Sequence, residues 1–186
     1  EFKIWMELLV QVKNSVLLLL ASDNKMKLNL IKEAKKADIE SKRLIFLEKT
    51  NLDDHLSRHS LADLFLDSFN CNAHTSAVDA LWAGLPILTK AGNSFASRIC
   101  GSLMNYFDMS ELVVDSEEEY LNKAIDLATD QKKYRDIKDR IIKAKKSGNY
   151  FDTKKYTLNL EKAYKKIHEM RITENKFENI YIKDIE

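Results

Sequence analysis

The sequence predicts an α/β fold: a Rossmann-like parallel sheet of about five strands with helices on both faces and a helical C-terminal extension. Short apolar runs of strand length alternate with segments of helical periodicity through residue 115. The runs are continuously apolar, as in strands covered on both faces, rather than alternating with polar residues. After residue 115 only helical patterns follow, so the sheet is expected to end there.

Five apolar runs carry the strand pattern, and they cover residues 15–21, 43–47, 62–67, 85–89 and 111–115. Helical segments lie between successive runs at residues 24–38, 52–60, 74–83 and 93–107. An amphipathic helix over residues 1–14 precedes the first run. This order predicts parallel strand–helix–strand units with right-handed crossovers.

The C-terminal part reads as a succession of helices. Ser116 followed by three glutamates is a strong helix start, because a hydroxyl cap and acidic residues suit the first turn. A basic helix and a further helix from Phe151 to Met170 follow. Residues 172–186 are compatible with a disordered tail, an edge strand or a segment that packs on a partner. We expect a lobe over residues 1–150, and a C-terminal helix and tail over residues 151–186.

Composition narrows the class of protein. The 186 residues are 45% hydrophobic and 32% charged, with a net charge of +1, so the overall field favours neither nucleic acid nor a membrane surface as a partner. The two cysteines, Cys71 and Cys100, lack metal-ligand spacing and suggest a reducing compartment. The longest apolar run is far shorter than a membrane span, and no export signal is visible. We therefore expect a cytoplasmic protein, and a start without methionine suggests a fragment.

Residues 70–89 carry the strongest functional signal. They read as a polar turn, a helix start, a short apolar helix, a Gly-Leu-Pro stop and a buried strand. His74, Thr75 and Ser76 would lie at the helix N-terminus, where free backbone N–H groups bind anions. Spacing alone favours simple capping by Thr75 or Ser76 over anion binding. Asp79 lies one turn further on the same face, either as an acceptor for a ligand hydroxyl or as an ordinary surface acid.

Several motifs occur in an order and spacing typical of one family. They are His55-Leu56-Ser57-Arg58, Leu61-Ala62-Asp63-Leu64-Phe65-Leu66-Asp67, Cys71-Asn72-Ala73-His74-Thr75-Ser76, Asp79-Ala80-Leu81-Trp82-Ala83-Gly84-Leu85-Pro86 and Ala96-Ser97-Arg98. With these motifs the sequence resembles the C-terminal half of the catalytic region of the O-linked N-acetylglucosamine transferases, nucleocytoplasmic enzymes of GT-B fold. The similarity extends to about Met170.

The resemblance implies the nucleotide-sugar-binding lobe of an inverting glycosyltransferase that needs no metal and no cofactor. Family members transfer N-acetylglucosamine from UDP to serine or threonine hydroxyls of proteins. Their N-terminal lobe and tandem helical repeats, which contact the acceptor, have no counterpart here, so the general base is expected outside this chain and the lobe alone is expected to be inactive. The alternatives are a transferase of the same fold that uses another UDP-sugar, such as UDP-glucose, and a degenerate nucleotide-binding or scaffold lobe.

The resemblance also implies roles for individual residues. It assigns the diphosphate to His74, Thr75 and Ser76, the ribose to Asp79, and the neighbourhood of the uracil to His55 and Arg58. For Arg58, an ion pair with Asp54 or Asp63 is an equally good interpretation. One position departs from the family: Leu52 stands where its members have a nucleotide-contacting lysine. His59 and His168 have no motif around them and are interpreted as ordinary histidines.

Overall fold

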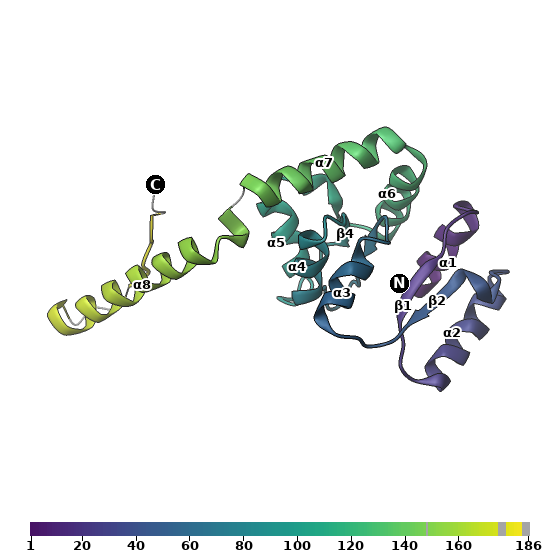
Figure 1. The fold of residues 1–186 in the computed structure, drawn as a ribbon, viewed down its shortest axis with the longest axis horizontal. Coiled ribbons are helices and arrows are strands. Elements are labelled where there is room, and N and C mark those ends of the chain that lie inside the picture. The colour runs from purple at the N-terminus through teal and green to yellow at the C-terminus, as the bar shows by residue number, and fades with distance from the viewer. Residues whose placement is uncertain (148, 175–177, 184–186) are drawn as a thin grey trace. The chain divides into compact units, whose positions relative to one another are not determined.

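The computed structural model describes residues 1–147, 149–174 and 178–183 (Figure 1). The chain divides into two compact units, Glu1–Ala144 and Lys145–Glu186. The domain boundary expected at residue 150 stays a prediction. No helix in the described ranges combines the length and the apolar character that a membrane span requires.

The first unit contains the sheet elements and most of the helices. In chain order its elements are α1 (Phe2–Gln11), β1 (Leu17–Leu20), α2 (Asn24–Lys36), β2 (Leu44–Leu47), α3 (Leu52–His59), β3 (Phe65–Leu66), α4 (Thr75–Trp82), β4 (Ile87–Lys90), α5 (Ile99–Tyr106), β5 (Val113–Val114) and α6 (Glu117–Thr129). Helix α7 (Gln131–Ser147) begins in this unit. Short 3₁₀ turns, Ser41–Arg43 and Ser110–Leu112, lead into β2 and β5.

All five strands pair in parallel, which confirms the predicted fold class. They form two hydrogen-bonded ladders, one of β1 and β2 and one in the order β3-β4-β5. Leu17 lies opposite Leu44 in the first ladder, and Phe65 lies opposite Ile87 in the second. Within the part of the chain that the structure describes, no ladder joins β1 to β3.

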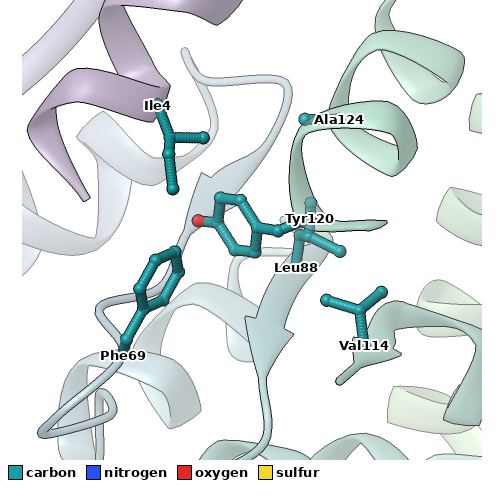
Figure 2. Packing of buried hydrophobic residues seen from close by; sticks show 6 residues of the cluster. All are labelled: Ile4, Phe69, Leu88, Val114, Tyr120 and Ala124. Carbon is teal, nitrogen blue, oxygen red and sulfur yellow. The ribbon is translucent and has the colours of Figure 1, made fainter. Parts of the chain in front are cut away.

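Helices cover both faces of the second ladder. On one face Leu88 packs with Val114, Phe69, Tyr120 of α6 and Ile4 of α1 (Figure 2). Neighbouring Thr89 points to the opposite face because side chains alternate along a strand. Thr89 is fully buried and shares its carboxylate partner, Asp67, with Cys100 of α5. The crossover arrangement predicted from the sequence is thus present around β4.

Helix α1 joins the two ladders. Its residue Ile4 belongs to the cluster around Tyr120, whereas Met6 and Leu9 pack with Ala34 of α2 and Leu44 of β2. Trp5 packs against both clusters. Burial of each large apolar side chain contributes about 1.5–3 kcal/mol to stability. Because the buried side chains of α1 pack on both ladders, this helix holds the two ladders together.

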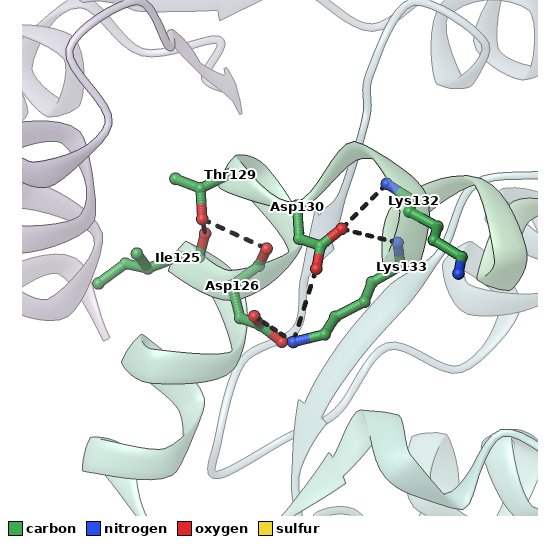
Figure 3. Close-up of polar contacts among 6 residues, drawn as sticks. All are labelled: Ile125, Asp126, Thr129, Asp130, Lys132 and Lys133. Carbon is green, nitrogen blue, oxygen red and sulfur yellow. Dashed lines mark hydrogen bonds and ion pairs between the residues drawn. The ribbon is translucent and has the colours of Figure 1, made fainter.

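The cap that the sequence predicts at Ser116 is present. The Ser116 hydroxyl accepts the Glu119 N–H at 3.1 Å, as expected for the start of α6. Asp130 then ends α6 and begins α7, because its carboxylate accepts the N–H groups of Lys132 and Lys133 (Figure 3). The Lys133 ammonium lies 2.7 Å from Asp126, so the same junction is held by side-chain charge.

The helix predicted over residues 93–107 begins later than expected, at Ile99. Residues before it form a turn in which the Ser94 N–H donates to the Ser97 hydroxyl, at 3.0 Å. The Gly92 N–H also donates to the Ser97 carbonyl, and the Arg98 guanidinium donates to the Asn93 carbonyl. Serine side chains compete in this way with helical backbone bonds, which is why periodicity alone placed the start too early.

The second unit is dominated by α8 (Thr153–Glu169), which follows a 3₁₀ turn at Asn149–Phe151 and leads into a π-helical turn at Met170–Glu174. The Asp152 carboxylate caps α8 by accepting the Lys155 N–H. Residues 178–183 adopt neither helix nor strand. The remaining residues of the predicted 172–186 segment, 175–177 and 184–186, lie outside the described residues.

Candidate functional site

The start of α4 presents an uncapped helix N-terminus. His74 is the N-cap residue, and its side chain makes no capping hydrogen bond. His74, Thr75 and Ser76 are all exposed. The N–H groups of Ala77 and Val78 donate to the His74 carbonyl, whereas those of Thr75 and Ser76 have no partner among the described residues. Simple capping of α4 by the Thr75 or Ser76 hydroxyl is therefore not observed.

Three of the other helices that follow strands of this unit contrast with α4, whereas α5, which follows β4, also lacks a side-chain cap. Asp23, Asn51 and Ser116 cap α2, α3 and α6 with their own side chains. At α4 the donor groups of the first turn instead face outward with two hydroxyls and an imidazole beside them. Such an arrangement suits an anion, which the helix dipole and the free N–H groups stabilise together.

Asp67 fixes the loop that leads to α4. Its side chain is almost completely buried at the end of β3, with 1% of the residue exposed. One carboxylate oxygen accepts the N–H groups of Ser68 and Ala73, at 2.9 and 2.7 Å. The other accepts the Thr89 hydroxyl at 2.6 Å. Because Ala73 immediately precedes His74, these bonds tie the start of α4 to the ends of β3 and β4.

The surroundings of the Asp67 side chain are closed to solvent. Burial raises the pKa of the Asp67 carboxyl, although its hydrogen bonds, the largest from Thr89, act in the opposite direction. Burial also raises the pKa of the Cys100 thiol, with a further contribution from the Asp67 charge. The Tyr120 hydroxyl donates to the Asp67 carbonyl at 3.0 Å. These contacts leave the loop little freedom, so the α4 start is positioned before any ligand arrives.

The sequence interpretation gave Asp67 no role of its own. A signal was nevertheless present, because an acid directly follows the apolar run Leu64-Phe65-Leu66. In open parallel sheets, the carboxyl ends of strands are where binding loops begin. A lone charge at that point, next to a strand that must be buried, indicates a group that organises a loop.

Helix α3 brings the second set of predicted residues to α4. The Asn51 side chain caps α3 by accepting the Asp54 N–H, so that His55 follows on the first turn. His55 Nε2 lies 3.4 Å from Asp79 Oδ2, and both side chains are partly exposed, at 36% and 23%. The ribose candidate and the uracil candidate are therefore in contact, although 24 positions separate them in the chain.

Arg58 has a different partner from the two that the sequence suggested. Its guanidinium donates to the Glu48 carbonyl at 2.7 Å, and no ion pair with Asp54 or Asp63 occurs within the described residues. Glu48 directly follows β2, so Arg58 ties α3 to the end of that strand. Leu52, in the position of the family lysine, begins α3 and is 64% exposed.

A largely apolar cavity of about 740 Å³ adjoins these groups. His55, Arg58 and Ser76 contribute to its polar side, and leucines of β1 and of the segment leading into β3 line much of the remainder. His74, Thr75 and Asp79 do not line it. The predicted site residues thus divide into a cavity-lining group and an exposed group at the α4 start, which the His55–Asp79 contact connects.

The comparisons with known proteins decide the family. A family model described as glycosyl transferase family 41 matches residues 1–160. The chain belongs to glycosyl transferase family 41. The family 41 match covers all of the first unit and part of the second, and it includes every residue of the candidate site, in agreement with the resemblance found in the sequence.

Similar proteins include family 41 relatives of much greater length. The probable UDP-N-acetylglucosamine–peptide N-acetylglucosaminyltransferase SEC of Arabidopsis thaliana is 32% identical over 164 residues, which are 88% of this chain and 17% of the plant protein. The UDP-N-acetylglucosamine–peptide N-acetylglucosaminyltransferase of Caenorhabditis elegans is 31% identical over 157 residues, 84% of this chain and 14% of the nematode protein. The chain therefore spans less than a fifth of the length of either relative.

A solved structure supports the same family 41 fold. The chain matches a mutant of the Thermobaculum terrenum O-GlcNAc transferase with a TM-score of 0.81 and 25% sequence identity. The match covers 89% of this chain and 32% of that protein. The predicted fold class, one lobe of a GT-B enzyme, agrees with this result.

Proposed function

We propose that this chain is the donor-binding lobe of an inverting protein O-glycosyltransferase, with UDP-N-acetylglucosamine as the donor. The observation that carries the proposal is the uncapped start of α4, held by Asp67 beside the His55–Asp79 contact. The names of the plant and nematode relatives, which state this donor and a peptide acceptor, support it.

In the proposed mechanism the lobe stabilises the leaving group. As the bond between the sugar and UDP breaks, negative charge grows on the β-phosphate. The free N–H groups of Thr75 and Ser76, their hydroxyls and the His74 imidazole would donate to that charge, assisted by the α4 dipole. Asp79 would accept hydrogen bonds from the ribose hydroxyls, and His55 would lie against the uracil. These donors would serve without a metal ion or a cofactor.

The remaining functions are proposed to lie elsewhere in a longer protein. In keeping with the family resemblance, we assign the general base that activates the acceptor hydroxyl to a second lobe. Helical repeats outside this chain would hold the protein acceptor. A cytoplasmic or nucleocytoplasmic location completes the proposal, in keeping with protein acceptors that carry free serine and threonine hydroxyls.

Calorimetric titration with UDP tests the proposed role of α4. The variant His74→Ala is compared with the wild-type chain and with His168→Ala, which removes an equally exposed histidine from α8. Loss of one donor to a charged phosphate is expected to weaken UDP binding by about 10-fold, whereas His168→Ala should bind as the wild type does. Equal affinity of all three proteins would overturn the role of His74, and transferase turnover by this chain alone would overturn the two-lobe assignment.

A degenerate scaffold lobe is the second candidate, because exposed Leu52 replaces a basic side chain at the start of α3. Thermal unfolding with UDP separates the two functions. A binding lobe gains about 2.7 kcal/mol of stability when UDP is at 100 times its Kd, whereas a scaffold without a nucleotide site gains none. In the full-length protein, competition between UDP-N-acetylglucosamine and UDP-glucose then identifies the donor.

A further inference from the structure

His59 ends α3 and is buried, with 9% of the residue exposed, although no motif marks it in the sequence. Its Nδ1 atom lies 2.8 Å from the carbonyl oxygen of His55, one helical turn earlier. A carbonyl oxygen only accepts hydrogen bonds, so Nδ1 of His59 carries the proton. This bond fixes the rotation of the His59 ring relative to the backbone of His55.

His59 makes two ring contacts, one with His55 and one with Phe65. The His55 ring meets it edge to face, with 4.7 Å between ring centroids and an angle of 85°. The Phe65 ring of β3 is nearly parallel to it, with 6.5 Å between centroids and an angle of 7°. Such arrangements are favourable beyond the burial of area. His59 therefore contacts a ring of β3 as well as the His55 imidazole, which it supports.

Among the described residues, the His55 side chain has only a weak polar contact of its own to fix its orientation. Its side chain is partly exposed, and its polar contact is the 3.4 Å approach of Nε2 to Asp79, which is long for a hydrogen bond. An exposed imidazole held only by such a contact samples several rotamers. The edge-to-face contact with the His59 ring restricts the rotamers that are open to His55 beside Asp79.

We propose that His59 is a positioning residue for nucleotide binding, acting through His55. This inference rests on the proposed function, because it takes the uracil and ribose of UDP as the groups that His55 and Asp79 receive. His59 also lines the cavity beside His55 and Arg58, but the proposal places the nucleotide against His55 and not against His59. Its effect is to hold the His55 ring in the bound orientation before UDP arrives, which spares the ligand the entropy of ordering it.

A double-mutant cycle in the full-length protein separates positioning from simple packing. UDP affinity is measured by calorimetry for the wild type, His59→Ala, His55→Ala and the double variant. We expect His59→Ala to weaken UDP binding about fivefold when His55 is present, and by less than about twofold in the His55→Ala background. Equal losses in the two backgrounds would overturn the proposal, because His59 would then act independently of His55.

Further variants guard against loss of folding. His59→Phe keeps a flat ring against both neighbours and should restore UDP affinity to within about twofold of the wild type. His59→Leu keeps apolar burial without the ring or the N–H, and it should weaken binding as His59→Ala does. Ile141→Ala removes a fully buried side chain from α7 and should destabilise the protein without changing UDP affinity. If Ile141→Ala weakens binding equally, or His59→Leu binds as the wild type does, the proposal fails.

The experiments distinguish failure of the proposed UDP-binding function from failure of the proposed role of His59. If the wild-type protein does not bind UDP, the proposed function falls and the role of His59 falls with it. If the wild type binds UDP and His74→Ala weakens it, but the cycle between His55 and His59 is additive, only the positioning role of His59 is refuted.

Discussion

Replacing Asp67 with asparagine tests whether one buried carboxylate organises the approach to α4. The carboxylate accepts hydrogen bonds from the Ser68 N–H, the Ala73 N–H and the Thr89 hydroxyl, and the Cys100 thiol is a further, weaker donor. An asparagine has a single acceptor oxygen. If that oxygen keeps the two N–H bonds, the amide NH₂ faces Thr89 Oγ1, and the Thr89 hydroxyl must turn its proton away from its present acceptor.

The expected magnitude follows from the three bonds with Ser68, Ala73 and Thr89. Hydrogen bonds to a charged group contribute about 1.5–3 kcal/mol each, and neutral ones about 1 kcal/mol. Asp67→Asn converts two bonds from charged to neutral and disturbs the third. Burying a neutral group in place of a charged one offsets part of this loss. The net decrease in the free energy of unfolding is expected to be about 2–3 kcal/mol. Domains of this size have about 5–15 kcal/mol of stability, so the variant should fold.

The loss of stability caused by Asp67→Asn should depend on pH. Burial raises the pKa of Asp67 in the folded state above its ordinary value, so the folded protein binds a proton more tightly than the unfolded chain does. The stability linked to this proton is fully present below the ordinary aspartate pKa and is lost as pH rises through the raised value. The wild type should therefore exceed Asp67→Asn by more at about pH 4 than at about pH 7.

Urea unfolding at the two pH values is the assay. Asp63→Asn, at an exposed position four residues earlier, serves as the matched control and should change stability by less than about 0.5 kcal/mol. Unfolding midpoints of Asp67→Asn that match the wild type would refute the organising role of this carboxylate. A difference that grows from pH 4 to pH 7 would refute the assigned direction of its pKa.

Three shorter predictions concern the same unit. Exposed Cys71 should react with a thiol reagent in the native protein, whereas buried Cys100, whose pKa is raised by burial, should react at least about 100-fold more slowly; equal rates would contradict the burial. Gly84→Ala should lower thermal stability by about 1 kcal/mol because Gly84 has φ +80°, although space for a Cβ exists; an unchanged melting temperature would show that the backbone relaxes. Tyr120→Phe should lower the unfolding free energy in urea by about 1–2 kcal/mol by leaving the Asp67 carbonyl without its donor, and no loss would mean that another group replaces it.

Much of the fold could be predicted from local patterns. A strand lies at each of the five apolar runs, with β4 extending one residue beyond its run to Lys90, because continuous apolar character is typical of strands buried on both faces. The strands are shorter than the runs, and β3 is limited to Phe65–Leu66. The start of α5 could not be placed, since it depends on hydrogen bonds between Ser94 and Ser97 that periodicity does not reveal.

The candidate site shows the same division between local and tertiary information. The position of His74, Thr75 and Ser76 at a helix start follows from the turn and the apolar helix after it. The contact of His55 with Asp79 depends on how α3 packs against α4, and spacing along the chain carries no such information. The roles of Asp67 and His59 likewise depend on partners from other strands and helices. The sequence motifs therefore did not indicate these roles, although Asp67 is part of one motif.

β1 and β3 each end a ladder, and residues of both line the cavity of about 740 Å³. Along β1, amide hydrogens that point toward β2 are bonded, and the alternate ones lie on the edge that no strand covers within the described residues. Hydrogen–deuterium exchange should therefore show protection that alternates along Leu17–Leu20 instead of uniform protection. Uniformly slow exchange along Leu17–Leu20 would contradict this free edge.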